Sequence, residues 1–554
     1  MPVPSESAES APTSAARPYR PADAGPLWSQ AGQMTIPGLL AEAVRQWPDR
    51  TFLEFGDVSY SFAAFDREAD RLARGLEAQG VVKGATVTTM LDNSDDAVLI
   101  WFAINKLGAI AVPLNTALKG GFLSHQINDA GSALLIAEAH YIPRVTAIRS
   151  ELTALRTIIA RGGQGDEFPD FSLLRACGDE PVASRVEPGD IALIIYTSGT
   201  TGPSKGCALP HGYVLTMSGR VREATDRRQD DVVLSPLPLF HIAATTNLIL
   251  ASMMVGARSV LLERFSLGRF WCEVEASGAT QVNLMGSMIA LIAHAPDSDV
   301  AARCFGQVRC ALGVPFPPPI ETIWRERFGT AIVGNHAFGM TEAAPVAYRR
   351  IGRERPGTSG ILSPDFDARV VDDRGEECPP GVPGELLLRP VRPNVMFTGY
   401  WGRPVETMAV FGDLWFHSGD IVSIDADGYL TFVDRKKDYL RRGGENISSF
   451  EIEAVFRAHP AIEDVAVHAV PSEVSEDELK VVAIPRDGMT VDAEELCRWS
   501  IERVPYYAVP RFIEFRTELP RTPTGRVMKH RLRAEGITAA TWDRAASSIV
   551  IEKR

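Results

Sequence analysis

Long apolar segments and paired cysteines are both missing from this 554-residue sequence. No apolar run reaches the roughly 18 residues that a membrane-spanning helix needs, and the N-terminus lacks the basic-then-apolar order of a secretory signal. The seven cysteines are odd in number and scattered, and no CxxC pair occurs. Because a disulfide framework or a structural zinc site needs regularly spaced pairs, we expect neither, and we predict a cytoplasmic protein with reduced thiols.

The sequence also has fewer basic than acidic residues. Acidic residues outnumber basic ones by 70 to 57, which gives a formal net charge of −13. A chain of this sign is not expected to bind nucleic acid or an anionic membrane, so we expect small-molecule partners. A polyanionic ligand would need locally concentrated cations and backbone N–H groups. Nothing in the sequence indicates an oligomeric state.

What the sequence does contain is a regular alternation of helical and strand patterns. Helices are predicted at 39–46, 65–77 and 95–106, and strands at 87–91 and 110–113. Strand, helix and strand in this rhythm favour a parallel α/β sheet with right-handed crossovers. The segment before this pattern, residues 1–25, is rich in Ala, Ser and Pro and is predicted to be a disordered tail.

The pattern changes twice towards the C-terminus. After about residue 355, short alternating runs such as 368–371 and 384–389 predict a small β-rich region. From about residue 438 the pattern is again mixed. We therefore predict an α/β fold with a large N-terminal domain of stacked α/β subdomains plus a β-rich subdomain, and a small mobile α+β C-terminal domain. The predicted boundaries are 26–434, a hinge at 435–437, and 438–554.

The most informative segment is YTSGTTGPSKG, residues 196–206, which follows an apolar strand at 191–195. Glycines allow close backbone approach, hydroxyls donate hydrogen bonds and Lys205 supplies a cation, so this loop can surround a triphosphate. The Walker pattern does not fit, because Lys205 is followed by Gly206 and not by Ser or Thr. The alternative is a flexible loop that joins a strand to a helix. The candidate phosphate-binding residues are Thr197, Ser198, Gly199, Thr200, Thr201, Gly202 and Lys205.

This loop resembles the phosphate loop of the adenylate-forming superfamily, which comprises acyl-CoA synthetases, adenylation domains of nonribosomal peptide synthetases and beetle luciferases. The resemblance covers about residues 35 to 535, and the motifs occur in the family's order. It implies ATP, Mg²⁺ and CoA as cofactors. The overall sequence pattern, including GENISSFEIE and PSEVSEDELK, is most similar to the carnitine/crotonobetaine-CoA ligase branch.

Two further motifs carry the resemblance to a nucleotide site. AFGMTE, residues 337–342, resembles the adenine and magnesium motif, in which Phe338 stacks on adenine, Thr341 donates to the α-phosphate and Glu342 is a ligand for Mg²⁺. The alternative is a helix start capped by Thr341. WFHSGD, residues 415–420, resembles the ribose motif, with Asp420 accepting from both ribose hydroxyls. The alternative there is a β-turn. Gly313 and Gly339 complete the implied nucleotide contacts.

The charged segment 434–438 and the segment after it resemble the parts of the family's enzymes that move between formation of the acyl-adenylate and transfer of the acyl group. Arg435 matches the ribose-contacting arginine and Lys437 matches the hinge residue, although a solvated linker is the alternative. Residues 441–453 resemble the loop that lines the pantetheine tunnel, and Arg441 and Arg442 are candidates for CoA phosphates. The implied contacts of this loop are Gly443, Gly444 and Glu445.

SPLPLFH, residues 235–241, resembles the segment that gates the acyl pocket, with His241 as the gate. The pocket implied by the resemblance mixes polar and apolar residues, so a long aliphatic chain is not the expected guest. Its expected members are His241, Thr245, Thr246, Asn247, Asn283, Met285, Gly286, Asn335 and Phe338.

The sequence departs from the family at its C-terminal lysine. The family pattern places Lys after the glycine of Pro-x-Thr-x-x-Gly, where it bridges carboxylate and α-phosphate, but here Gly525 is followed by Arg526. Lys529 lies three residues on and is the other candidate. Arg is a planar fork and Lys a compact point charge, so the exchange is not neutral.

The resemblance implies an AMP-forming acid–thiol ligase that makes an acyl-adenylate and transfers the acyl group to CoA. The implied catalytic residues are Lys205, His241, Thr341, Glu342 and Arg526. The departure at Arg526 leaves alternatives open. These are a retuned ligase, an enzyme with an unusual oxyanion or a non-CoA acceptor (an amine, a carrier-protein thiol, or nitrite for diazotisation), and a homologue that binds nucleotide without turnover.

Overall fold

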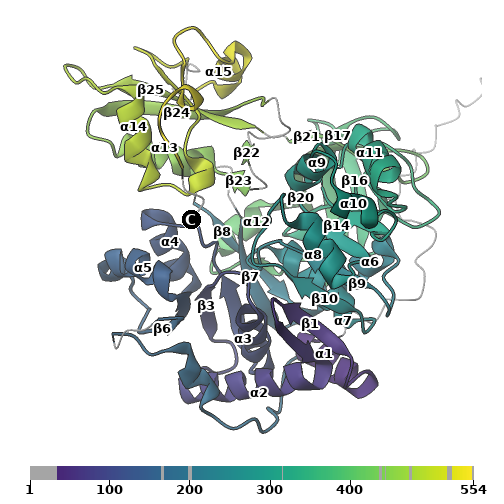
Figure 1. The fold of residues 1–554 in the computed structure, drawn as a ribbon. Coiled ribbons are helices and arrows are strands. Elements are labelled where there is room, and N and C mark those ends of the chain that lie inside the picture. The colour runs from purple at the N-terminus through teal and green to yellow at the C-terminus, as the bar shows by residue number, and fades with distance from the viewer. Residues whose placement is uncertain are drawn as a thin grey trace, which may run out of the picture.

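The computed structural model describes residues 34–163, 167–197, 203–314, 316–435, 440–442, 445–472, 477–520 and 527–551. Within them the chain forms a large N-terminal domain and a smaller C-terminal domain, both mixed α/β (Figure 1). The expected fold class is therefore confirmed. The predicted tail at 1–25 lies outside the described residues.

Two mostly parallel sheets form the frame of the large domain. The first is seven-stranded, in the order β18 (Gly399–Tyr400), β8 (Lys205–Pro210), β7 (Ile191–Thr197), β4 (Ile110–Pro113), β3 (Thr86–Met90), β5 (Leu134–Glu138) and β6 (Thr157–Arg161). The second is six-stranded, in the order β12 (Cys310–Leu312), β11 (Gln281–Asn283), β9 (Val232–Ser235), β10 (Arg258–Leu261), β1 (Thr51–Phe55) and β2 (Val58–Ser61).

Helix α3 (Asp95–Lys106) has local signals in its sequence that explain why it could be predicted. Ser94 accepts a hydrogen bond from the N–H of Ala97 at 3.1 Å, and two aspartates occupy the first turn, where the helix dipole favours negative charge. The helix contacts both β4 and β1, so it packs between the two sheets. The other helices of the large domain are α1 (Ile36–Gln46), α2 (Phe62–Ala78), α4 (Gly120–Ala130), α5 (Ile142–Ala147), α6 (His211–Thr225), α7 (Ala251–Met253), α8 (Phe270–Ser277), α9 (Gly286–Ala293), α10 (Asp299–Arg303), α11 (Pro318–Phe328) and α12 (Pro404–Ala409).

The β-rich region predicted after residue 355 is present and is antiparallel. A three-stranded sheet contains β13 (Ala337–Met340), β14 (Ala343–Tyr348) and β15 (Ile361–Leu362). A five-stranded sheet contains β16 (Phe366–Val371), β17 (Gly384–Pro390), β19 (Phe411–Gly412), β20 (Trp415–Ile424) and β21 (Leu430–Arg435). Buried side chains of these sheets join the main hydrophobic core, so this region is part of the large domain.

The small domain has a separate hydrophobic core. Its elements are β22 (Leu440–Arg442), β23 (Glu445–Ile447), α13 (Ser449–Arg457), β24 (Ile462–Val470), β25 (Glu478–Pro485), α14 (Ala493–Ile501), β26 (Phe512–Phe515), α15 (Lys529–Glu535) and β27 (Trp542–Asp543). Strand β21 ends at Arg435, and Lys437 lies outside the described residues. The hinge at 435–437 therefore stays a prediction.

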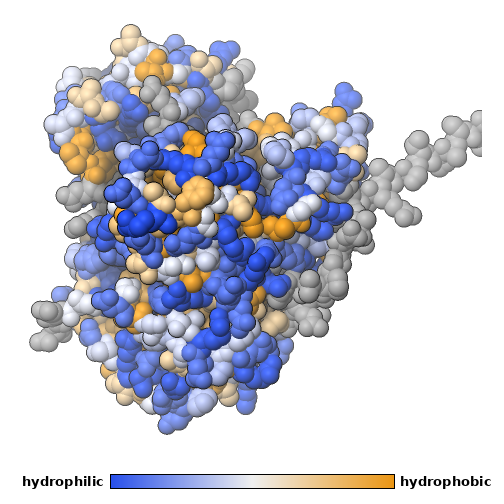
Figure 2. Space-filling model, turned by 45° about the vertical axis from the view of Figure 1, so that its right-hand side comes forward, coloured by the Kyte–Doolittle hydropathy of each residue, from blue (hydrophilic) through white to orange (hydrophobic). Residues whose placement is uncertain are grey.

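The surface is mostly hydrophilic on the face that Figure 2 presents, with hydrophobic side chains in small groups. The most exposed large apolar side chains include Leu414, Val405 and Met408. Over the ranges that the structure describes, no helix is both long and apolar enough to traverse a bilayer.

A buried ion pair ties α6 to the β-rich region. Arg220 binds Asp365 through two hydrogen bonds of 2.8 and 3.1 Å, and the two side chains are 5% and 2% exposed. Removing Arg220 takes two hydrogen bonds from a carboxylate in a low-dielectric site, where Arg392 remains a partner at 2.6 Å. We expect Arg220→Leu to lower the free energy of unfolding by about 3 kcal/mol, measured by urea denaturation. Arg228→Leu is the control, because its pair with Asp226 is largely exposed and should be worth less than about 1 kcal/mol. If both variants lose the same free energy of unfolding, the Arg220–Asp365 pair stabilises the fold no more than an exposed pair does.

Candidate nucleotide and acyl-transfer site

The predicted phosphate loop is the connection between two antiparallel strands. Thr197 of β7 pairs with Lys205 of β8, and Tyr196 with Gly206, so the alternative of a strand-to-helix connection is wrong. Gly206 is required by packing, since a Cβ there would meet Ile194 Cγ2 at 2.6 Å. The central residues Ser198, Gly199, Thr200, Thr201 and Gly202 lie outside the described part of the chain.

Ser204, at the end of this connection, is held from three directions. Gln126 Nε2 donates to Ser204 Oγ at 3.1 Å, and His125 Nε2 lies 2.8 Å from Ser204 O. Ser204 N donates to Glu451 Oε1 at 2.8 Å. Glu451 belongs to α13 of the small domain, so this last contact crosses between the domains.

Three motifs that are far apart in sequence meet at Lys205. Its ammonium lies 4.8 Å from the centre of the Tyr400 ring, and Tyr400 donates its hydroxyl to Glu342 Oε1 at 2.9 Å. The described residues contain no group of three or more His, Cys, Asp or Glu side chains that could hold a metal. A single oriented carboxylate suits Mg²⁺ that takes its other ligands from phosphates and water. The cluster thus joins a cation, an aromatic ring and one carboxylate.

Thr341 and Glu342 form the tip of the β13–β14 hairpin, where Met340 pairs with Ala343. The alternative of a helix start capped by Thr341 is therefore wrong. Tyr213 donates its hydroxyl to Thr341 O at 3.1 Å, which fixes the tip from α6. Gly339 lies on β13, where a Cβ would meet Ala343 O at 2.9 Å.

The adenine and ribose motifs lie side by side. The Phe338 and Phe432 rings are 5.7 Å apart, so β13 lies next to β21. Asp420 of β20 is 2% exposed and pairs in register with Arg435 of β21. The alternative of a β-turn is wrong, because Ser418, Gly419 and Asp420 lie within β20, where Asp420 N donates to Ser418 Oγ at 3.1 Å. The strand pairing thus brings both predicted ribose contacts to one place, although the side chain of Arg435 is outside the described atoms.

The predicted acyl gate is in contact with the small domain. His241 Nε2 lies 2.9 Å from Glu445 Oε1 of β23, and both side chains are mostly buried. Asn93 fixes the gate segment, since its amide donates to Leu237 O at 2.9 Å and its carbonyl accepts from Leu239 N at 3.0 Å. Gly443 and Gly444 lie outside the described residues.

The polar acyl-pocket candidates are carried by a π-helix, Ala244–Leu250. Its wide turns bury Thr245, Thr246 and Asn247, and Asn247 Nδ2 lies 3.4 Å from Asn283 Oδ1. Such helices are rare and often occur at functional sites. Thr245 lines the second cavity described below, and the polar wall of an acyl pocket stays a prediction.

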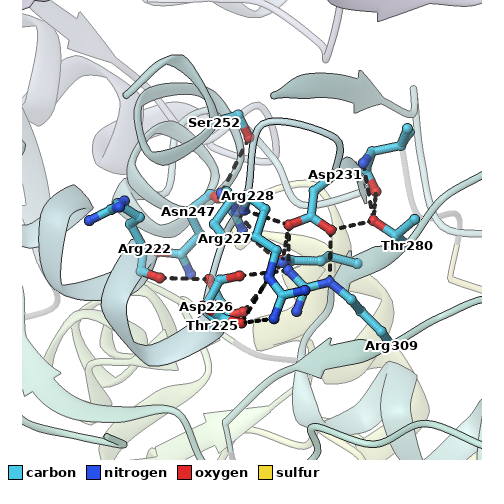
Figure 3. Close-up of polar contacts among 12 residues, drawn as sticks. Arg222, Thr225, Asp226, Arg227, Arg228, Asp231, Asn247, Ser252, Thr280 and Arg309 are labelled. Atoms are coloured by element: carbon cyan, nitrogen blue, oxygen red, sulfur yellow. Dashed lines mark hydrogen bonds and ion pairs between the residues drawn. The ribbon is translucent and has the colours of Figure 1, made fainter. Parts of the chain in front are cut away.

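A buried arginine network supports the π-helix (Figure 3). Arg227 donates to the carbonyl of Asn247, to Ser252 Oγ at 3.3 Å and to Gln281 Oε1 at 3.2 Å. Burial lowers the pKa of the Arg227 guanidinium to about 10. An ion pair between Asp231 and Arg309 lies in the same network. The Asn247 carbonyl of the π-helix thus accepts a hydrogen bond from a buried side chain.

The remaining predicted contacts lie around the C-terminal ends of β11 and β12. Met285 caps α9, which begins at Gly286. A Cβ at Gly313 would meet Ile289 Cδ1 at 1.9 Å, so this glycine is required by close packing. Asn335 pairs with Gly313 and accepts from Phe316 N at 2.7 Å through Oδ1. The side-chain oxygen of Asn335 is therefore already bonded to the backbone of Phe316.

A cavity lies between the two domains next to the gate. It is lined from the large domain by Gln126, Ser204 and His241, and from the small domain by Glu445 and Glu451, among others. The cavity leads to the gate segment, where Phe240 also lines a second, mostly apolar cavity. A thin substrate arm could reach the acyl gate by this route.

Lys529, the second candidate for the family's lysine, is bound within the small domain. Lys529 Nζ is 2.6 Å from Glu453 Oε1 and 2.7 Å from Ser449 Oγ, both in the small domain. Figure 1 shows α15 at the end of the small domain that points away from the large domain. In this domain arrangement Lys529 is thus not at the nucleotide site, and Arg526 lies outside the described residues.

Arg442 is also used within the small domain. It pairs with Glu478 at 2.9 Å and donates to Val509 O at 2.7 Å. A role in holding CoA phosphates does not fit these contacts. The side chain of Arg441 is outside the described atoms.

Sequence reasoning missed four residues that organise the site: Tyr400, Asn93, Arg227 and Glu451. Tyr400 lies 58 residues from the carboxylate that it binds, and Glu451 lies 247 residues from Ser204. No local pattern signals such contacts. Only for Glu451 was there a cue, the Ser448-x-x-Glu451 spacing, and that cue predicts a cap within its own helix.

Comparison with known proteins agrees with these observations. The family model of AMP-binding enzymes matches residues 40–401, and that of the AMP-binding enzyme C-terminal domain matches residues 451–526. The chain is 35% identical to a feruloyl-CoA synthase of Amycolatopsis sp. over 88% of this chain and 96% of that protein. It is 30% identical to a crotonobetaine/carnitine-CoA ligase of Salmonella arizonae, again over 88% and 96%.

Among solved structures, an anthranilate CoA ligase in complex with anthranoyl-AMP superposes with a TM-score of 0.69 at 27% identity. The match covers 91% of this chain and 97% of that one. The expected superfamily and its carnitine-ligase-like branch are thus confirmed.

Tyr400→Phe tests the contact with Glu342. The variant keeps the ring beside Lys205 but removes the donor that orients the carboxylate. Because losing such an outer partner typically costs about 10–100-fold in metal affinity or activity, we expect at least a tenfold weaker affinity for Mg·ATP by calorimetry. Tyr60→Phe is the matched control, since Tyr60 also donates to a carboxylate, that of Asp95, at 2.8 Å. Unchanged Mg·ATP affinity in Tyr400→Phe would show that the phenol does not orient Glu342.

Proposed function

The chain belongs to the family of AMP-binding enzymes, and we propose that it is an AMP-forming acyl-CoA ligase. The observation that carries the proposal is the meeting of Lys205, Tyr400 and Glu342, which joins the phosphate and magnesium motifs to strand β18 in one cluster. The CoA ligases to which it is similar over most of its length support the same activity.

In the first half-reaction, a carboxylate oxygen of the acid attacks the α-phosphorus of ATP, and pyrophosphate leaves. Lys205 and the Thr197–Gly202 loop hold the phosphates, and Thr341 contacts the α-phosphate. Glu342 would hold Mg²⁺, which would supply positive charge to neutralise the phosphates. Phe338, Gly339 and Gly313 hold adenine, while Asp420 and Arg435 hold ribose. Catalysis is mainly positioning and electrostatic stabilisation of the developing charge.

In the second half-reaction, the sulfur of CoA attacks the acyl carbonyl and AMP leaves. The pantetheine arm runs through the interdomain cavity, past Gly443, Gly444 and Glu445, to His241. No protein nucleophile is needed, because the mixed anhydride is already activated. The small domain turns about Lys437 between the two steps.

The acid is proposed to be compact and partly polar. Thr245, Thr246 and Asn247 are already bonded to Ile242 O and to one another. Support comes from the buried Asn283, whose Nδ2 has no hydrogen-bond partner among the described residues and would stay unsatisfied against a long aliphatic chain. Met285 and Phe338 supply the apolar part of the pocket. The named acids of the relatives, ferulate and anthranilate, are aromatic, and carnitine is small and polar.

The test is acid-dependent exchange of labelled pyrophosphate into ATP, run with hydroxycinnamates, aminobenzoates, carnitine and straight-chain fatty acids. Exchange with one of the first three groups, followed by AMP-coupled thioester formation with CoA, is the expected result. Exchange with fatty acids alone would overturn the proposed acid class. Exchange with no acid would overturn the proposed function.

Asp420→Ala tests the ribose contact. The change removes two charge-assisted hydrogen bonds, each worth about 1.5–3 kcal/mol, so ATP affinity should fall by about a hundredfold or more in calorimetry. Asp367→Ala is the control, because Asp367 is a buried carboxylate of the same sheet. If ATP binds Asp420→Ala as tightly as the parent, Asp420 does not hold the ribose.

Arg526 tests the departure from the family pattern. A cation aimed at charge that develops in the transition state contributes about 10²–10³ in rate, so Arg526→Ala should slow adenylation by that factor. Transfer from preformed acyl-AMP to CoA should change little. Arg526→Lys separates a retuned site, which should lose activity, from one that merely tolerates Arg, which should gain it. If Arg526→Ala adenylates as fast as the parent protein, Arg526 has no catalytic role, and Lys529 is the next residue to mutate.

A further inference from the structure

Helix α4 contacts the residues at both ends of the connection between β7 and β8. Where the chain returns to the sheet, Gln126 Nε2 donates to Ser204 Oγ at 3.1 Å. Where the chain leaves it, the Tyr196 hydroxyl lies 3.0 Å from Asp129 Oδ2 and 3.1 Å from Gln126 O. Gln126 and Asp129 are three residues apart, so they lie on the same face of the helix. One rigid element therefore holds Tyr196 and Ser204 at a fixed separation.

The Tyr196 phenol is a fixed donor to Asp129. Burial raises the pKa of Tyr196, and the charge of Asp129 and the hydrogen bond to it raise this pKa further. The phenol therefore keeps its proton at neutral pH and donates to the carboxylate. The backbone of Tyr196 pairs with Gly206 of β8, so the side chain and the strand are held together.

Asp129 also binds a second segment of the large domain. Arg403 Nε and Nη2 donate to Asp129 Oδ1 at 3.1 and 2.5 Å, which leaves Oδ2 for Tyr196. The Asp129 side chain is only 11% exposed, and hydrogen bonds between two charged groups are among the strong ones. Arg403 N donates to Tyr400 O at 3.1 Å, so the turn that Asp129 holds is the one that follows Tyr400.

We propose that Asp129 is a positioning residue for the triphosphate of ATP. It joins Tyr196, where the predicted phosphate connection begins, to the turn that carries Tyr400, whose ring and hydroxyl contact Lys205 and Glu342. The carboxylate thereby fixes the separation between the groups proposed to hold the phosphates and the group proposed to hold Mg²⁺. The inference rests on the proposed function and adds the residue that sets this separation.

Other buried ion pairs of the large domain do not join two parts of the nucleotide site. Lys106 pairs with Asp70 at 2.6 Å between α3 and α2. Glu138 pairs with Arg161 at 3.0 Å between β5 and β6. Asp129 differs from these carboxylates because each of its oxygens binds a residue next to a predicted nucleotide contact.

The experiment measures binding of Mg·ATP and of AMP to the full-length protein by calorimetry. Asp129→Asn keeps the shape of the side chain and removes the charge that binds Arg403. Tyr196→Phe keeps the ring and removes the donor. The matched control is Glu138→Gln, because it removes a carboxylate charge of similar burial from a pair with an arginine in the same sheet.

Asp129→Asn should weaken the affinity for Mg·ATP by about tenfold, the lower end of the effect of losing a group that orients other binding groups. Its affinity for AMP should equal that of the parent, because AMP lacks the β- and γ-phosphates. Tyr196→Phe should weaken Mg·ATP in the same direction by a smaller factor. Glu138→Gln should bind both nucleotides like the parent.

Equal affinity of the parent and Asp129→Asn for Mg·ATP would overturn the proposal. Equal weakening of Mg·ATP and AMP would also overturn it, since Asp129 would then only stabilise the fold, and so would the same selective loss in Glu138→Gln. Melting temperatures check folding, and Tyr196→Phe keeps the test valid if Asp129→Asn unfolds. The binding measurement needs no turnover, so a protein that binds as expected but adenylates no acid would contradict the proposed function alone.

Discussion

The antiparallel pairing of β7 with β8 is the constraint on which the rest of the site depends. It fixes Thr197 opposite Lys205 and returns the chain to the sheet at a defined residue. Strand β18 then pairs with β8, with Tyr400 opposite Cys207, which brings the Tyr400 ring to Lys205. Because neighbouring strands lie about 4.8 Å apart, a ladder of hydrogen bonds places these side chains with little freedom. Glu342 is joined to the same ladder through the Tyr400 hydroxyl.

The second constraint is electrostatic. A chain with net charge −13 has to hold polyanions, so positive charge and N–H groups must be concentrated where phosphates bind. Lys205 and Ser204 N–H provide one such place, and a carboxylate of the small domain occupies it in the present arrangement.

The acyl side is built on a different principle, a buried polar network under a π-helix. Arg227 carries its charge into the interior and donates to the carbonyl of Asn247 in the π-helix. Such a network is costly if any member is left without a partner. It holds the threonine and asparagine side chains of the π-helix in place, and these are the residues on which the proposed class of acid depends.

The sequence by itself determined the fold class and the motifs. Strong local signals were enough for α3, predicted and found at residues 95–106, and for β4 at 110–113, because their caps and apolar runs lie within the segment. The segments that resemble the phosphate, adenine and ribose motifs could also be located, since each is a short stretch of sequence, and their roles stay predictions.

Tertiary structure alone decided what surrounds those motifs. It turned the phosphate loop into a connection between strands, put Thr341 and Glu342 at a hairpin tip, and bound Lys529 to Glu453 in the small domain. It also supplied Tyr400, Asn93 and Arg227. The physical reason is the same in each case: these contacts join residues separated by tens to hundreds of positions, and their geometry is set by strand pairing and domain docking, which no local pattern of residues encodes.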